Sequence, residues 1–270
     1  MCKPPVKWVG GKRQLLSQLT PLLPTHFRHY YEPFFGGGAL FFFLKPNIAT
    51  LTDLNPELIN LYMVIKNKPN ELIASLGQHI NEHDYYYQIR AMDRDEAIFV
   101  NLSDVERASR FMFMNRTGYN GLWRVNSKGQ NNVPFGRYIN PTILDADNLM
   151  NCSNALKHAK IECTDFYSIK KNIKAQDFIY FDPPYHPVNM TSSFTSYTKA
   201  GFGEDMQFKL KELCDYITQK GAYFMLSNSY TPLMLDLYKD YKAVPVEANR
   251  AINCKASGRG KIKELLIRNY

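Results

Sequence analysis

The residues with the clearest chemical potential are Asp182, Pro183, Pro184 and Tyr185, which follow one another along the chain. Two prolines stiffen the turn, so that a carboxylate and a backbone carbonyl can lie in one plane as hydrogen-bond acceptors. Such a pair suits an amine on an aromatic ring, because the ring otherwise delocalises the lone pair that must attack. Tyr185 offers a surface for stacking that ring. We therefore predict that Asp182, Pro183 and Tyr185 activate an exocyclic amine for attack on a methyl group; the alternative is a structural turn with an exposed tyrosine.

A second motif is the turn that ends in Gly36-Gly37-Gly38. Glycines after a strand let a ligand approach the backbone at the amino end of a helix. Asp53 ends the next expected strand, where folds of this kind accept hydrogen bonds from ribose hydroxyls. The residues after the glycines do not complete a dinucleotide-binding fingerprint. Two simpler interpretations stay open, namely a tight turn without a ligand and Asp53 as the cap of the next helix.

These motifs need a parallel sheet to bring them to one edge. Apolar runs alternate with helical patterns, which is typical of strands joined by crossover helices. The run Phe178 to Phe181 is apolar throughout, as in a central strand buried on both faces. Asp182 would then lie at the carboxyl edge of the sheet, where ligands bind in open α/β folds. Further strands are expected at residues 48–52, 161–164 and 223–226 and near 244 and 265, and helices at 57–66, at 204–219 and after 232.

A stretch of different composition interrupts the sheet pattern. Residues 70–114 are polar and amphipathic, and residues 115–138 are rich in Gly, Asn and Arg. We expect an α/β, Rossmann-like catalytic domain formed by residues 1–56 and 158–270. Residues 57–157 would be an inserted, mostly helical module.

The formal net charge of +8 is concentrated in two segments. Residues 107–144 contain six cations and no acid, and residues 248–263 contain five cations and no acid. Because these eleven charges exceed the total, the rest of the chain carries a net charge of −3. The pattern predicts a phosphate-binding face that includes Arg250, Lys255 and Arg259; a solvated basic surface is the alternative.

Composition argues against several other classes of protein. No apolar run approaches the 18 or more residues of a membrane span, and the first residues lack the pattern of a signal peptide. The five cysteines are scattered, with no Cys-x-x-Cys pair, and are expected to be reduced thiols. The six histidines show no paired spacing, so we expect no metal site. The expectation is a soluble protein of the bacterial cytoplasm.

Five motifs in order make the chain resemble the Dam and DpnM family of α-group, D12-class adenine-N6 DNA methyltransferases over essentially its whole length. They are Lys7–Lys12, Glu32–Gly38, Thr52-Asp53, Thr164–Phe166 and Asp182–Tyr185. The resemblance implies a methyltransferase sheet, S-adenosyl-L-methionine as methyl donor, S-adenosyl-L-homocysteine as product and adenine in double-stranded DNA as target. Lys12 would lie near the methionine end of the donor and Asp53 on its ribose. The full set of implied donor contacts is Trp8, Lys12, Glu32, Phe34, Gly36, Gly38, Asp53, Asp165, Phe166 and Asp182.

The resemblance also assigns the inserted module to target recognition and implies the DNA site GATC. Arg124 would read guanine, and Tyr119 would enter the gap left by an extruded adenine. Leu122 and Pro134 would touch other base edges, and the alternative for Arg124 is a phosphate contact. The full set of implied DNA contacts is Arg116, Tyr119, Asn120, Leu122, Arg124, Asn126, Pro134, Arg137, Phe194, Tyr197, Arg250 and Arg259.

Asp182 also separates this interpretation from its rivals. Related enzymes that methylate protein glutamine have Asn at this position, and cytosine-N4 enzymes usually have Ser. A DNA-binding relative without catalysis would not need both Asp182 and Tyr185.

The role could be that of a modification enzyme, paired with a restriction endonuclease, or of a housekeeping methylase; a monomer is expected. Residues 188–203, with Phe194 and Tyr197, are expected to order over the extruded base, unless they are only a solvated connector.

Overall fold

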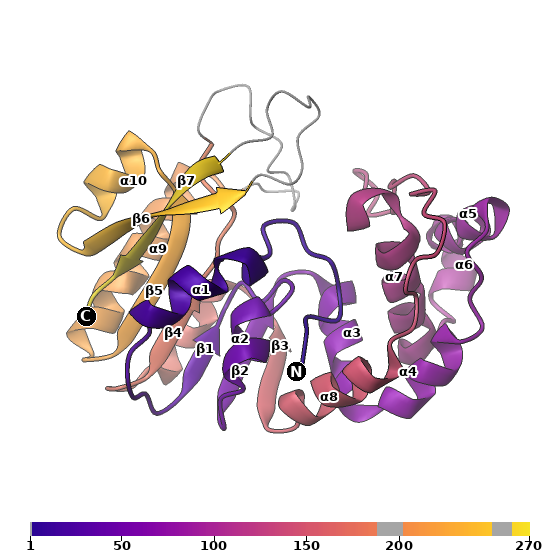
Figure 1. Cartoon of the computed structure of the whole chain (residues 1–270), viewed down its shortest axis with the longest axis horizontal. Helices are drawn as coiled ribbons and strands as arrows, with labels where there is room; N and C mark the ends of the chain where they lie inside the picture. Colours follow the sequence, from indigo (N-terminus) through magenta and orange to yellow (C-terminus); the bar gives the residue numbers. More distant parts are fainter. Residues whose placement is uncertain (1, 188–201, 250–260) are drawn as a thin grey trace. The chain divides into compact units, whose positions relative to one another are not determined.

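The computed structural model describes residues 2–187, 202–249 and 261–270, and the fold is mixed α/β (Figure 1). Its sheet is mostly parallel: β1 pairs in parallel with β2 and β4, and β4 pairs in parallel with β5, whereas β7 runs antiparallel to both β5 and β6. The order of the seven strands found in these residues is β3-β2-β1-β4-β5-β7-β6. Their bounds are β1 Tyr30–Glu32, β2 Ala49–Asp53, β3 Ala159–Cys163, β4 Phe178–Phe181, β5 Tyr223–Ser229, β6 Lys242–Asn249 and β7 Lys261–Arg268. The expected α/β class with a Rossmann-like sheet is confirmed.

The chain folds into two compact units. The first unit comprises Met1–Gly11, Gly36–Lys45 and Asp53–Cys163, and the second comprises Lys12–Phe35, Pro46–Thr52 and Thr164–Tyr270. These boundaries differ from the division expected at residues 57 and 157, because the amino-terminal segment and the glycine turn fold with the helical residues. The functional division into a catalytic domain and an inserted module stays a prediction.

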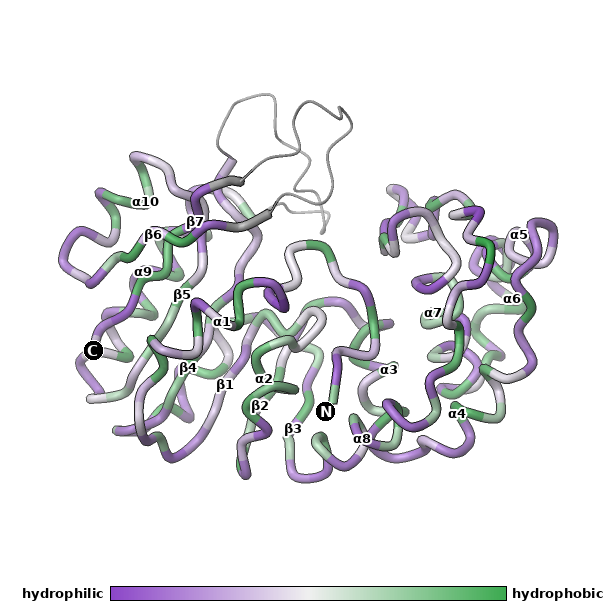
Figure 2. Tube along the Cα trace, viewed as in Figure 1, coloured by the Kyte–Doolittle hydropathy of each residue, from purple (hydrophilic) through white to green (hydrophobic). Residues whose placement is uncertain are grey.

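The second unit is built on strands β1, β2 and β4 to β7. Strand β4 is buried throughout, as its apolar sequence predicts. Helix α9 packs on β5 through Leu210, Leu213 and Ile217, which repeat with the period of a helix. Hydrophobic and hydrophilic residues accordingly alternate along the helices (Figure 2). The helical elements are η1 Lys12–Leu15, α1 Leu16–Leu19, η2 Thr20–Leu22, η5 Phe166–Asn172, α9 Glu204–Gln219 and α10 Pro232–Leu237.

The first unit is mostly helical and centres on α7, Asp104–Thr117, which packs against α3, α4 and α5. Helix α7 starts at a capping box in which Ser103 and Glu106 satisfy each other's backbone N–H groups. Pro56 opens α3, as its fixed φ favours. The remaining helical elements are α2 Ala39–Leu44, α3 Pro56–Asn67, α4 Pro69–Leu76, α5 His83–Ala91, η3 Met92–Arg94, α6 Glu96–Phe99, η4 Tyr119–Gly121 and α8 Ala146–Leu156. None of the helices in the described residues is long and apolar enough to cross a bilayer.

Two asparagines of the first unit hold the amino-terminal segment in place. Asn115 pairs with the backbone N–H and carbonyl of Lys7 at 2.9 and 2.8 Å. Asn148 does the same for Lys3, at 2.9 Å for both bonds. Each side-chain amide thereby replaces a neighbouring strand as partner of an otherwise irregular backbone. Trp8 is therefore presented by a fixed segment.

Candidate active site

The Asp182 carboxylate lies directly after β4, at the carboxyl edge of the sheet. Its Oδ1 atom is 2.8 Å from Nζ of Lys12, and the two side chains are 20% and 5% exposed. The same ammonium lies 4.7 Å from the centroid of the Tyr185 ring. The structure thus brings together three residues that lie up to 173 positions apart in the sequence.

Burial raises the pKa of Asp182 to about 6, against the opposing effect of the Lys12 ammonium. The negative charge of Glu264 raises this pKa further. Above this pKa the group is a carboxylate, which accepts hydrogen bonds and donates none. It therefore suits an amine substrate.

The backbone around Asp182 and Tyr185 is held by buried amides. Gln207 donates to the Pro184 carbonyl at 3.2 Å, and Asn228 accepts from the His186 N–H at 3.1 Å. Asn228 and Gln207 also bond to each other at 3.1 Å. Neither residue was predicted from the sequence; the polar end, Ser227-Asn228-Ser229, of an otherwise apolar strand is a signal for Asn228, whereas Gln207 lies in α9 without one.

An aromatic cluster lies beside this turn in the second unit. Phe34 stacks on Phe166 with a centroid distance of 5.3 Å and meets Phe202 edge-on at 5.5 Å. Asp165 caps η5 by accepting from the Tyr167 N–H at 2.7 Å and from the Ser168 N–H. Of the predicted donor contacts, Phe34 and Phe166 are thus in contact with each other, and Asp165 has a structural role as well.

Glu32, another predicted donor contact, is a buried residue of β1. Its carboxylate accepts a hydrogen bond from the Tyr30 hydroxyl at 2.7 Å. Burial and the neighbouring Glu32 charge raise the pKa of Tyr30, so the phenol stays a donor.

The glycine turn of the first unit packs directly on Trp8. Gly36 and Gly38 have φ angles of +45° and +63°, which side chains rarely adopt. A Cβ atom on Gly36 would lie 2.6 Å from Cδ1 of Trp8. The turn therefore requires glycine for both its backbone and its contact.

Asp53 fixes this turn. Its Oδ2 accepts from the Gly36 N–H and its Oδ1 from the Asn55 N–H, both at 2.9 Å. Burial raises the pKa of Asp53, while these backbone donors lower it. The cap of helix α3 is Asn55, whose side chain accepts from Glu57 and Leu58. The alternative of Asp53 as the helix cap is therefore wrong.

The predicted recognition residues lie on an irregular hairpin of the first unit, closed by bridges between Gly118 and Phe135 and between Val125 and Asn131. Tyr119 is 52% exposed, and Leu122 is half-buried. The exposed Arg124 guanidinium is oriented by the Asn132 side chain, with 2.6 Å between Nε and Oδ1. The hairpin thus presents an aromatic ring and a cation to solvent.

Four further predicted DNA contacts shape or flank this hairpin. Asn126 makes the turn, accepting from Lys128 and Gln130. Asn120 has a φ of +54° and donates its N–H to the Tyr138 hydroxyl. The Pro134 carbonyl accepts from the Tyr119 N–H, and Arg137 is exposed with a φ of +55°.

The positive charge of residues 107–144 is only partly at the surface. Arg107 pairs with Glu57, and the buried Arg110 pairs with Asp93 at 2.7 Å. Arg116 is half-buried and donates to the Pro5 carbonyl. The sequence could not show these partners, because they lie outside the basic segment. The exposed cations among the six are Arg124, Lys128 and Arg137.

Comparison with known proteins decides the family. A family model described as D12 class N6 adenine-specific DNA methyltransferase matches residues 8–252. The chain belongs to this family. The type II methyltransferase M1.LlaDCHI of Lactococcus lactis subsp. cremoris is 47% identical over 272 residues, covering 99% of this chain and 95% of the relative. The type II methyltransferase M.MjaIII of Methanocaldococcus jannaschii is 42% identical over 288 residues, covering 99% of both. The DNA adenine methylase of Vibrio cholerae is 34% identical over 268 residues, covering 97% of this chain and 94% of the relative.

The chain is therefore a D12-class DNA adenine methyltransferase, and the resemblance inferred from its motifs is confirmed. Some residues predicted for this methyltransferase lie outside the described part of the structure. They are Phe194, Tyr197, Arg250 and Arg259, and the expectation that residues 188–203 order over the base falls largely on the same segments.

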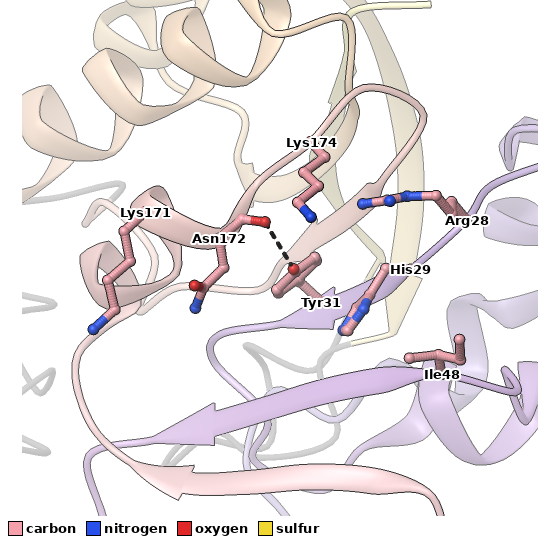
Figure 3. A pocket seen from close by; sticks show the side chains of 7 residues that line it. All are labelled: Arg28, His29, Tyr31, Ile48, Lys171, Asn172 and Lys174. Carbon is pink, nitrogen blue, oxygen red and sulfur yellow. Dashed lines mark hydrogen bonds between the residues drawn. The ribbon is translucent and has the colours of Figure 1, made fainter.

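An open pocket of the methyltransferase lies at the opposite edge of its sheet (Figure 3). Its volume is about 370 Å³, and its lining residues precede β1, β2 and β4 or belong to β1 and η5. Because the amino ends of parallel strands share one edge, this pocket is separate from Asp182. The lining residues are Arg28, His29, Tyr31, Ile48, Lys171, Asn172 and Lys174.

Proposed function

We propose that this methyltransferase transfers a methyl group from S-adenosyl-L-methionine to N6 of an adenine in GATC sites of double-stranded DNA, after the adenine has been extruded from the duplex. The observation that carries the proposal is the Asp182 carboxylate at the end of β4, paired with the Lys12 ammonium, which also lies over the Tyr185 ring. An extruded base would stack on Tyr185 and give its amine to Asp182 and the Pro183 carbonyl.

The Lys12 ammonium pairs with one of the two oxygens of the carboxylate that the amine needs. It bonds to Asp182 and covers the Tyr185 ring, so it makes the contacts expected of the substrate amine. A carboxylate has two oxygens and about four acceptor sites, so the amine can bond to Asp182 while Lys12 stays on Oδ1. Asp182 can accept a hydrogen of the amine and hold the proton that the nitrogen loses, because its pKa is raised to about 6 with Lys12 beside it.

The residues proposed to bind the donor fit a ligand that approaches the backbone closely. S-adenosyl-L-methionine, when bound, supplies the electrophilic methyl group as a sulfonium. The turn at Gly36 has no side chain of its own, the Trp8 ring packs against it, and Asp53 anchors its N–H, so these three residues form one fixed surface for the donor. We include Lys12, Glu32, Phe34, Gly38, Asp165 and Phe166 in this set on the resemblance alone.

We propose that the recognition hairpin reads the DNA. Tyr119 is exposed enough to enter the space left by the extruded adenine. Arg124 donates to Asn132 through Nε and Nη2, and the other N–H groups of Nη1 and Nη2 can be presented to the O6 and N7 atoms of guanine. We also propose that the enzyme acts as a monomer in the bacterial cytoplasm.

Two relatives at 47% and 42% identity are named type II methyltransferases, which favours a modification enzyme paired with a restriction endonuclease. The 34% identical DNA adenine methylase favours the second candidate, a housekeeping methylase. A cognate endonuclease encoded beside this chain would decide between them.

Expression in cells that lack GATC methylation tests the proposed site. The DNA should become resistant to a GATC-cutting enzyme that methylation blocks, and stay sensitive to one that ignores methylation. N6-methyladenine outside GATC, with unprotected GATC sites, would contradict the proposed specificity.

A further inference from the structure

Glu264 is a buried carboxylate that the proposed chemistry does not use. It lies on β7 opposite Ser229 of β5 and is 7% exposed. Its Oε2 atom accepts a hydrogen bond of 2.6 Å from the Tyr185 hydroxyl. A buried charge is unfavourable unless it is compensated, so a carboxylate here needs a reason beyond packing.

The hydrogen bonds of the buried amides hold backbone groups next to Tyr185 and not its ring. Gln207 holds the Pro184 carbonyl, and Asn228 and Ser229 hold the N–H and carbonyl of His186. The backbone is thus fixed on both sides of Tyr185. These backbone bonds do not set the side-chain torsions of Tyr185, and the bond to Glu264 restrains the ring at its far end.

The chemistry of the bond favours a carboxylate over a neutral acceptor. A hydroxyl bonded to an ionised carboxylate typically gives 2.5 to 2.7 Å and about twice the strength of a neutral pair. The distance of 2.6 Å lies in that range. Burial raises the pKa of Tyr185 well above its usual value, so the phenol keeps the proton that it donates.

We propose that Glu264 is a positioning residue that holds the Tyr185 ring in the orientation in which it stacks on the target adenine. The inference rests on the proposed function, in which the extruded base stacks on Tyr185. Glu264 acts through Tyr185, so its effect falls on base capture and methyl transfer and leaves duplex binding unchanged.

The test compares Glu264→Gln, Tyr185→Phe and the double variant in single-turnover methylation of a GATC duplex, with 2-aminopurine fluorescence at the target position. The matched control is Glu212→Gln, because Glu212 accepts an equal 2.6 Å bond from Tyr167 on the exposed face of α9. Glu264→Gln should slow methyl transfer and the fluorescence rise by at least about tenfold, with the Kd for DNA unchanged. Glu212→Gln should keep the wild-type rate.

Two measurements distinguish a positioning role of Glu264 from a nonspecific disturbance of the folded structure. In a Tyr185→Phe background, Glu264→Gln should slow the reaction by no more than about twofold, since the bond is already lost. Removing the Glu264 charge should also move the acid limb of the pH–rate profile to lower pH, whereas Tyr185→Phe should leave it in place. The other groups that face Asp182 are Lys12, Tyr30, Tyr180 and Tyr185, with Glu32 behind the two tyrosines of the strands, and all stay unchanged in Glu264→Gln.

A wild-type rate for Glu264→Gln, or rate losses that multiply in the double variant, would overturn the inference. Where Glu264→Gln does not fold, a wild-type rate for Tyr185→Phe would overturn it equally. Absence of N6-methyladenine with the wild-type protein would instead refute the proposed function, which keeps the two failures distinct.

Discussion

At the scale of single residues, the ion pair with Lys12 favours the ionised form of Asp182 before the substrate binds. The 2.8 Å contact keeps an acceptor ionised although burial raises its pKa to about 6. A less buried carboxylate would ionise more easily but would be a weaker base for the proton that the amine loses. At neutral pH the carboxylate of Asp182 is therefore ionised, and its pKa of about 6 is high enough for it to act as a base.

The raised pKa of Asp182 predicts an acid limb in the activity. Protonation below a pKa of about 6 removes the acceptor, so kcat/KM for a GATC duplex should fall about tenfold per pH unit below that value and level off above it. Steady-state assays between about pH 5 and about pH 8 measure this, with folding followed by circular dichroism. A profile that stays flat down to about pH 5 in folded protein would contradict the assignment of Asp182 as acceptor.

At the scale of elements, Asn115 connects three parts of the first unit. This buried residue of α7 bonds to both backbone groups of Lys7, beside Trp8, and donates to the Gly121 carbonyl in the hairpin at 2.8 Å. One side chain thus holds the segment proposed to bind the donor and the hairpin proposed to read DNA.

Replacing Asn115 by Leu should therefore destabilise the protein more than the loss of one surface contact. Three hydrogen bonds at about 1 kcal/mol each, with buried partners left unpaired, predict a loss of roughly 3 kcal/mol in the free energy of unfolding. Urea denaturation measures this, with Asn60→Ala as control, because half-buried Asn60 bonds to the Asp104 carbonyl through an exposed hydrogen bond. Equal effects for the two variants would show that Asn115 does not hold these segments.

The sequence predicted elements well where their signal is local. Strand β4 follows from four consecutive apolar residues, and α9 from an amphipathic repeat that begins after Gly203. Contacts between distant residues could not be predicted in this way. Glu264 lies 79 positions from Tyr185, and Asn115 lies 108 positions from Lys7, with no local pattern that marks either pair. The motif at Lys12 was identified by resemblance, because a lysine near the amino terminus has no signature of its own.

At the scale of the whole molecule, the charge excess is smaller at the surface than the sequence indicated. Arg107 and Arg110 are neutralised by acids from other parts of the first unit. Arg116 is half-buried and donates a hydrogen bond to the Pro5 carbonyl. The exposed cations of this segment, Arg124, Lys128 and Arg137, remain to neutralise phosphates or to read bases.

This distribution predicts how DNA binding depends on salt. Each phosphate contact contributes about 0.9 to the slope of log K against log salt concentration, so neutralising Arg124, Lys128 and Arg137 together should reduce its magnitude by up to about 3. Fluorescence anisotropy at several salt concentrations measures the slope. Arg107→Gln is the control and should leave the slope unchanged, because its charge is already paired. An unaltered slope in the triple variant would place the DNA on another surface.

The most direct test of the central claim is methyl transfer by Asp182→Ala. Purified protein, S-adenosyl-L-methionine and a GATC duplex are mixed, and N6-methyladenine is quantified by mass spectrometry after nuclease digestion. We predict stoichiometric N6-methyladenine with the wild-type protein and none with Asp182→Ala, which should stay folded and bind the duplex with unchanged Kd. Methyl transfer by Asp182→Ala at a rate near that of the wild type would contradict the account.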